Sequence, residues 1–131
     1  MIVVDTNVIA YLHIPGVYST AAAQLLEADS HWVAPVLWRS EFRNLLAAHL
    51  RRGTLSLTDV MDVQAQAEEL LAGCEYETES AAVFELIAAS DRSAYDCEFV
   101  ALARRLRTRL VTMDKKLVRA FPERAVPLIL A

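Results

Sequence analysis

The sequence predicts an α/β fold with a mostly parallel sheet flanked by helices. Short apolar runs of a few residues alternate along the chain with longer segments of helical periodicity, which is typical of this fold class. The composition, 55% apolar and 23% charged residues, is that of a chain with a packed core and excludes intrinsic disorder. Neither a linker nor a repeat divides the chain, so we expect one domain spanning residues 1–131.

The first half of the chain is predicted to contain two short strands and three helices. In chain order, the strands are expected at 2–4 and 31–34, and the helices at 18–28, 35–52 and 58–71. The first strand ends at Asp5. Pro35 suits the opening position of a helix, and Gly53 suits its end. Thr58 is the expected N-cap of the third helix.

The second half is predicted to contain three strands and three helices. The strands are expected at 74–77, 110–113 and 126–130, and the helices at 79–89, 94–105 and 115–121. Ser93 is a suitable N-cap for the second of these helices, and Pro122 ends the third. Asp114 directly follows the apolar run 110–113.

Several classes of protein are excluded by composition. Cys74 and Cys97 form no CxxC motif or Cys/His cluster, which argues against a disulfide scaffold and a structural zinc site. No apolar stretch reaches the roughly 18 residues of a membrane span, and the first residues carry no basic leader. We therefore expect a soluble cytoplasmic protein with no membrane partner.

Charge is distributed unevenly around the net value of −4. Residues 53–91 contain nine acidic and no basic residues, whereas residues 92–131 contain nine basic and four acidic residues. A positive C-terminal third could bind phosphates on one face of the protein, because the local field decides such contacts. The alternative is that these basic residues form a solvated helix end.

Four carboxylates occupy unusual positions. Asp5 and Asp114 each follow a predicted buried strand, where parallel sheets form their ligand crevice, although either residue alone could simply cap a helix. Glu41 and Asp96 lie on or beside the apolar stripes of their helices. Glu98, two residues further along, is expected to face solvent.

Ionised carboxylates gathered in one pocket need compensation, because each charge raises the pKa of the others. Arginine side chains are one source, with Arg39, Arg43 and Arg92 as candidates. Divalent cations are the other. Oxygen ligands without a nearby imidazole or thiolate favour Mg²⁺ or Mn²⁺ over Zn²⁺, and such ions support phosphoryl-transfer chemistry.

The same segments resemble the motifs of PIN-domain ribonucleases. They are VVDTNVIAYL (3–12), APVLWRSEFRNLLA around Glu41, SAYDCEFVALA (93–103) and LVTMDKKL (110–117), and they occur in the family's order. The size of the chain further resembles the VapC toxins of bacterial type II toxin–antitoxin pairs. The resemblance implies a three-layer fold built on about five parallel strands, and hydrolysis of RNA that depends on Mg²⁺ or Mn²⁺ and leaves 5′-phosphate and 3′-hydroxyl ends.

Site residues and partners also follow from the resemblance. It implies metal ligands at Asp5, Glu41, Asp96 and Asp114, supported by Thr6, Asn7, Ser93 and Thr112. Lys115, Lys116 and Arg92 are candidates for contacts with RNA phosphates. The implied protein partners are a cognate VapB-like antitoxin and a second copy of the chain. Large apolar residues could supply that surface or simply fill the core: Tyr11, Leu12, Trp32, Trp38 and Leu50.

Two other functions remain as alternatives. Asp5 at a strand end could serve as the nucleophile of a phosphatase, although that class usually has a second Asp where this chain has Asn7. A non-catalytic PIN-like module that binds RNA or protein is the other alternative.

Overall fold

A five-stranded sheet with every strand parallel forms the centre of the computed structural model, which describes residues 1–129. Its strands are β1 (Ile2–Val4), β2 (Trp32–Pro35), β3 (Glu75–Tyr76), β4 (Leu110–Thr112) and β5 (Ala125–Pro127). Their order across the sheet is β3-β2-β1-β4-β5. The predicted α/β class and parallel sheet are therefore confirmed.

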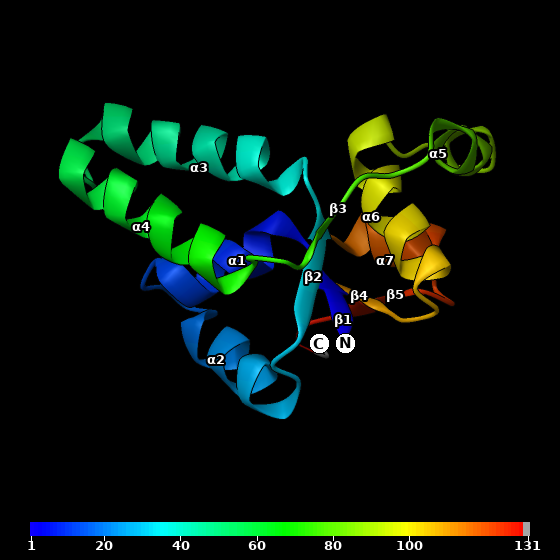
Figure 1. The fold of residues 1–131 in the computed structure, drawn as a ribbon, viewed down its shortest axis with the longest axis horizontal. Coiled ribbons are helices and arrows are strands. Elements are labelled where there is room, and N and C mark those ends of the chain that lie inside the picture. Colours follow the sequence, from blue (N-terminus) through cyan, green and yellow to red (C-terminus); the bar gives the residue numbers. More distant parts are fainter. Residues whose placement is uncertain (130–131) are drawn as a thin grey trace.

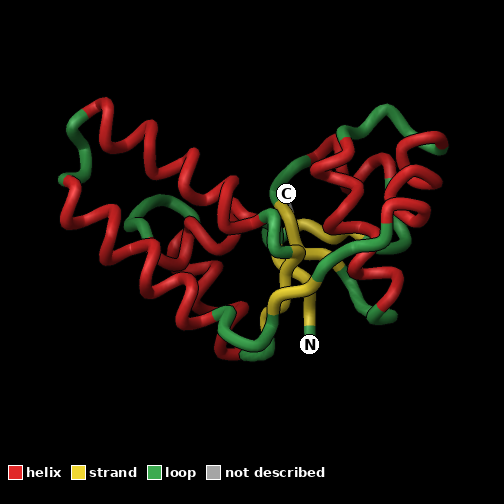
Figure 2. Tube along the Cα trace, turned by 45° about the horizontal axis from the view of Figure 1, so that its top comes forward, coloured by secondary structure: helices red, strands yellow, loops and turns green. Residues whose placement is uncertain are grey.

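Helices cover both faces of this sheet (Figures 1 and 2). One side carries α1 (Thr6–His13), α2 (Ser19–Ala28), α3 (Trp38–Arg52) and α4 (Leu57–Leu70), and the other carries α5 (Ser80–Ala88), α6 (Ala94–Arg105) and α7 (Lys115–Ala120). Because crossovers between parallel strands are right-handed, the helices change face when the chain returns from β3 to β4. None of the helices within residues 1–129 is long and apolar enough to cross a membrane.

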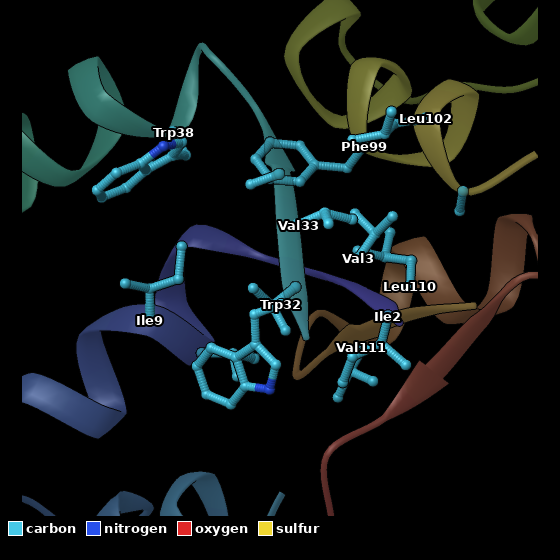
Figure 3. Packing of buried hydrophobic residues seen from close by; sticks show 14 of the residues in the cluster. Ile2, Val3, Ile9, Trp32, Val33, Trp38, Phe99, Leu102, Leu110 and Val111 are labelled. Carbon is cyan, nitrogen blue, oxygen red and sulfur yellow. The ribbon is translucent and has the colours of Figure 1, made fainter. Parts of the chain in front are cut away.

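The core lies on both faces of the sheet, which explains why the strands are apolar without alternation. In Figure 3, Trp32 points toward the face where Ile9 of α1 lies, whereas Val33 points toward Phe99 of α6. Trp38, at the start of α3, is also fully buried. Both tryptophans therefore belong to the core and are not partner surface.

Three local predictions were wrong. No helix was expected over residues 6–13, where α1 lies; its N-terminus is capped by the Asp5 side chain. Pro35 does not open a helix but ends β2, because the Val36 N–H continues the pairing with Tyr76 O at 2.9 Å. The N-cap of α4 is Ser56 and not Thr58.

The predicted short strand at residues 74–77 is confirmed as β3, which pairs in parallel with β2. The last strand is shorter than expected and ends at Pro127; residue 130 of the predicted strand lies outside the described residues.

The topology places a switch point between β1 and β4. These neighbouring strands pair in parallel, but the chain leaves β1 toward β2 and leaves β4 toward β5 on the opposite side. The connections that follow them diverge, and parallel sheets bind ligands at such a switch point, beyond the carboxyl ends of the strands. Asp5 follows β1 directly, and Asp114 lies two residues after β4.

Candidate active site

Asp5 is fixed in position by both of its carboxylate oxygens. Its Oδ1 accepts a hydrogen bond from the Thr6 N–H at 2.8 Å, which caps α1, and its Oδ2 accepts one from the Thr112 hydroxyl at 2.7 Å. The Asp5 N–H also donates to Val111 O at 3.0 Å, which continues the pairing of β1 with β4. The carboxylate thus has a defined orientation at the switch point.

Thr112 also connects Asp5 to the second acid at this edge. Its hydroxyl oxygen accepts a hydrogen bond from the Asp114 N–H at 3.0 Å while it donates to Asp5. Asp114 caps α7, because its Oδ1 accepts from the N–H groups of Lys116 and Leu117 at 2.9 and 3.2 Å. The two strand-end acids are therefore joined through one buried hydroxyl group.

Glu41 approaches from α3 and is held by Thr6. The buried Thr6 hydroxyl donates to Glu41 Oε1 at 2.7 Å, so α1 and α3 are linked beside Asp5. Glu41 lies in the first turn of α3 and is half-buried, as its position beside the apolar stripe predicted.

Asp96 comes from the first turn of α6, where Ser93 is the N-cap and accepts from the Asp96 N–H at 3.1 Å. Arg92 is the basic residue at this carboxylate, yet its Nη1 lies 3.9 Å from Asp96 Oδ2, whereas its Nε donates to Asp91 at 3.0 Å. Arg39, another arginine considered from the sequence, binds Glu75 and Glu68 instead. Arginine pairing thus leaves the charge of the site largely uncompensated.

The pKa values of three site carboxyls are raised, in each case mainly by burial. The charges of Asp96 and Asp114 raise the pKa of Asp5 further, and the charge of Asp114 does the same for Asp96. The pKa of Glu41 is raised further by Asp5, Asp96 and Glu98. Each of the four acids thus acts on, or is acted on by, at least two of the others, as expected of carboxylates that lie near one another.

Four helix N-termini also meet at this edge of the sheet. Asp5 caps α1 and Asp114 caps α7, while Glu41 and Asp96 lie in the first turns of α3 and α6. Carboxylates at a helix N-terminus are stabilised by its unpaired N–H groups and by the helix dipole, by about 0.3–1 kcal/mol each. The backbone therefore offsets part of the repulsion among the acids.

The residues at the site fit a divalent cation by their chemistry. All four candidate ligands are carboxylates, the hard oxygen donors that Mg²⁺ and Mn²⁺ prefer. Within residues 1–129, no three acidic, histidine or cysteine side chains are already arranged as a closed ion site. Mg²⁺ often binds through only one or two protein carboxylates and keeps several waters, so a closed cage is not required.

The remaining predicted residues surround these acids. Asn7 is exposed on α1, next to the buried Thr6, and Lys115 and Lys116 are exposed at the start of α7. Glu98 differs from its expectation: it is half-buried and accepts a hydrogen bond from the Thr78 hydroxyl at 3.0 Å. The helical wheel of α6 placed Glu98 away from Asp96 but could not show that the chain between β3 and α5 covers that side.

Comparison with known proteins identifies the class. The PIN domain family model matches residues 2–121, so the chain belongs to the PIN domain family. Ribonuclease VapC3 of Pyrobaculum aerophilum is 26% identical over 129 residues, which cover 96% of this chain and 98% of that protein. The resemblance to PIN-domain, VapC-like proteins is confirmed by these two matches.

Two solved structures share the fold. FitAcB from Neisseria gonorrhoeae aligns with a TM-score of 0.77 and 18% identity over 98% of each chain. The structure of FitAB bound to an IR36 DNA fragment aligns with a TM-score of 0.74 and 18% identity over 100% of this chain and 98% of that chain.

Proposed function

We propose that residues 1–131 form one domain that acts as an endoribonuclease dependent on Mg²⁺ or Mn²⁺, the toxin of a type II toxin–antitoxin pair. The observation that carries this proposal is the gathering of four carboxylates at the switch point with little cationic compensation, where burial and the neighbouring negative charges raise the pKa values of Asp5, Glu41 and Asp96. Membership of the PIN family and the likeness to ribonuclease VapC3 support RNA as the substrate.

Asp5 and Asp96 would hold the principal ion, with Glu41 and Asp114 completing its surroundings. When bound, such an ion supplies activation of water and neutralisation of charge on the phosphate. Thr6 and Thr112 orient their carboxylate partners through the 2.7 Å hydrogen bonds to Glu41 and Asp5. Charged ligands held in advance by a second set of hydrogen bonds lose little order when an ion binds.

The substrate backbone would be held by cations at the rim of the site. Lys115 and Lys116 are exposed directly after Asp114, and Arg92 lies beside Asp96. Contacts of this kind with phosphates do not depend on base sequence and weaken as salt concentration rises.

Substitution of one ligand tests the reaction. Asp5→Asn keeps an acceptor for the Thr6 N–H but removes the charge, so RNA cleavage in Mn²⁺ should fall at least about 100-fold, the scale of losing one charge-stabilising group. The matched control is Glu68→Gln, which neutralises a carboxylate that contacts Arg39 away from the site and should keep its activity. Equal cleavage by Asp5→Asn and the unmodified protein would rule out the proposal.

The antitoxin would bind the apolar groove between α3 and α4. This groove has a volume of about 440 Å³, and Leu46, Leu50, Val60 and Met61 contribute to its lining. Met61 and Leu50, which are 62% and 39% exposed, both lie at this groove, and a surface where large apolar side chains gather is typical of a partner site. An antitoxin is first sought by co-expressing the chain with the product of the adjoining gene. Met61→Asp should abolish its co-purification, whereas Glu69→Ala, on the same helix, should leave it intact.

A further inference from the structure

A second cavity lies at the same edge of the sheet as the four acids. It has a volume of about 450 Å³, within the range of small-ligand sites. Val36, at the end of β2, and Thr78, after β3, line one part of it, and Phe84 of α5 and Glu98 of α6 line the rest. In Figure 1, α5 and α6 lie beside one another on the side of the sheet away from α3.

This cavity adjoins the candidate active site through two residues. Glu98 lies two residues after Asp96 on α6, and its charge is one of those that act on Glu41. Val36 lies between β2 and the start of α3, the helix that carries Glu41. If the acids hold a phosphate of the RNA, the base of a neighbouring nucleotide could therefore enter the cavity.

The charged groups of the cavity suit a hydrogen-bond donor and not a phosphate. Its lining includes two carboxylates, Glu77 and Glu98, and neither lysine nor arginine among the described residues. An anion would be repelled there. Glu98 Oε1 already accepts from the Thr78 hydroxyl at 3.0 Å, which orients the carboxylate and leaves acceptor capacity for a ligand.

The rim of the cavity provides an aromatic surface. Phe84 is 67% exposed although it is among the largest apolar side chains, and its ring belongs to the lining. Exposed aromatic rings next to polar acceptors are how proteins hold the unstacked bases of single-stranded RNA, with stacking on the ring and hydrogen bonds to the base edge.

We propose that this cavity is a base-recognition subsite for a guanine that neighbours the cleaved phosphodiester, with Phe84 stacking on the base and Glu98 accepting its N–H groups. Guanine carries two adjacent donors on its Watson–Crick edge, the ring N1–H and the exocyclic N2 amine, which match the two oxygens of a carboxylate. Adenine and cytosine offer one amine on that edge, and uracil offers one ring N–H. The inference rests on the proposed ribonuclease function and adds a base preference to it.

Binding to RNA that cannot be cut tests the subsite directly. The Asp5→Asn protein is titrated with short single-stranded RNAs that carry one guanosine in a uridine background, and with the same RNAs carrying inosine, which lacks the N2 amine. Guanosine RNA should bind roughly tenfold more tightly, the scale of discrimination by a well-formed base contact. The double variant with Glu98→Gln should lose this ratio. With Phe84→Leu, both RNAs should bind more weakly at an unchanged ratio.

Cleavage provides the second arm. Sequencing of the ends left in a randomised RNA pool should show guanine enriched at one position beside the cut for the unmodified protein and not for Glu98→Gln. Equal binding of guanosine and inosine RNAs, or an unchanged ratio in the double variant, would overturn the subsite. Guanosine preference in binding without any cleavage by the unmodified protein would support the subsite and refute the ribonuclease proposal.

Discussion

Two clusters of carboxylates on opposite sides of α3 differ in how their charges are compensated. Glu75 of β3 accepts hydrogen bonds from Arg39 at 2.6 and 2.7 Å and from the Trp38 indole N–H at 2.9 Å, and the same guanidinium contacts Glu68 at 3.0 Å. Arg39 thereby lowers the pKa of Glu75. At the candidate active site, burial raises the pKa of Asp5 instead.

Burial raises the pKa of the carboxylates in both clusters, so the difference in pKa comes from the groups that contact them. A guanidinium within hydrogen-bond distance stabilises the ionised form of Glu75, whereas Asp5 is surrounded by other acids. A carboxylate held by arginine serves the packing of β3 against α3. Asp5 accepts hydrogen bonds only from neutral groups, Thr6 N–H and the Thr112 hydroxyl, so its negative charge is left for a cation to balance. Structural acids and candidate ligands should therefore respond differently to pH and to added metal.

The largest expected effect on stability comes from adding an ion. At Mn²⁺ a hundredfold above the dissociation constant, the unmodified protein should gain roughly 2.7 kcal/mol of unfolding free energy. Asp5→Asn should lose most of this gain, while Glu75→Ala should keep it, because Glu75 belongs to the arginine cluster. Thermal unfolding with and without Mn²⁺ measures both. If Mn²⁺ stabilised the unmodified protein and Asp5→Asn equally, Asp5 would be excluded as a ligand.

Breaking the arginine cluster should cost the next largest amount. Glu75→Ala leaves the Arg39 guanidinium and the Trp38 indole N–H without their acceptor, so the unfolding free energy at pH 7 should fall by about 1–3 kcal/mol. Because the pKa of Glu75 is lowered in the folded state, this difference should shrink as pH falls through that folded pKa. Chemical denaturation at pH 7 and pH 3 checks it, with Glu77→Ala as the exposed control; a constant difference would contradict the assignment.

Removing the charge of Asp5 should raise the unfolding free energy in the absence of metal, by less than the loss caused by Glu75→Ala. Below the ordinary pKa of 3.8, Asp5 is neutral in both the folded and unfolded states, so Asp5→Asn should match the unmodified protein. As pH rises through the raised folded pKa, only the unmodified protein must bury a charge, and it should become the less stable of the two. Melting curves in chelator across this range test the prediction. A variant that becomes less stable than the unmodified protein as pH rises would refute it.

The smallest effect is expected at an exposed ion pair. Arg104 Nη2 lies 3.3 Å from Glu123 Oε1, with side chains 48% and 56% exposed. Solvent screens such pairs, so Arg104→Ala should change the unfolding free energy by less than about 0.5 kcal/mol. Chemical denaturation in low salt measures this loss of unfolding free energy. A loss as large as that of Glu75→Ala would show that exposed and partly buried arginine–carboxylate pairs contribute equally to stability.

The strands and the four acids could be predicted because their signals are local. Apolar runs ending at Asp5 and near Asp114 are visible in a few consecutive residues, and a parallel sheet brings such ends together. The placement of Glu41 and Asp96 followed from helical periodicity. These patterns indicate which side of an element is buried, and they pointed to Asp5, Glu41, Asp96 and Asp114 but not to Glu98, whose charge also acts on Glu41.

Other features depend on which elements pack together, and sequence pattern did not reveal them. The pairing of Arg39 with Glu75 joins residues 36 positions apart, across the packing of α3 with β3. The burial of Glu98 depends on Thr78, in the segment before α5. The helix α1 is different, because Asp5 is recognisable from the sequence as a possible N-cap, yet no helix is predicted after it.

The four helices that begin around the acids affect how the chain folds in the absence of metal. Their N–H groups favour negative charge before any ion arrives, so the polypeptide can reach its final shape while divalent metal is scarce. The repulsion that remains among the four carboxylates would favour the binding of a cation. Under the proposed function, folding and activation would be separate events, and the concentration of free metal would govern only activation.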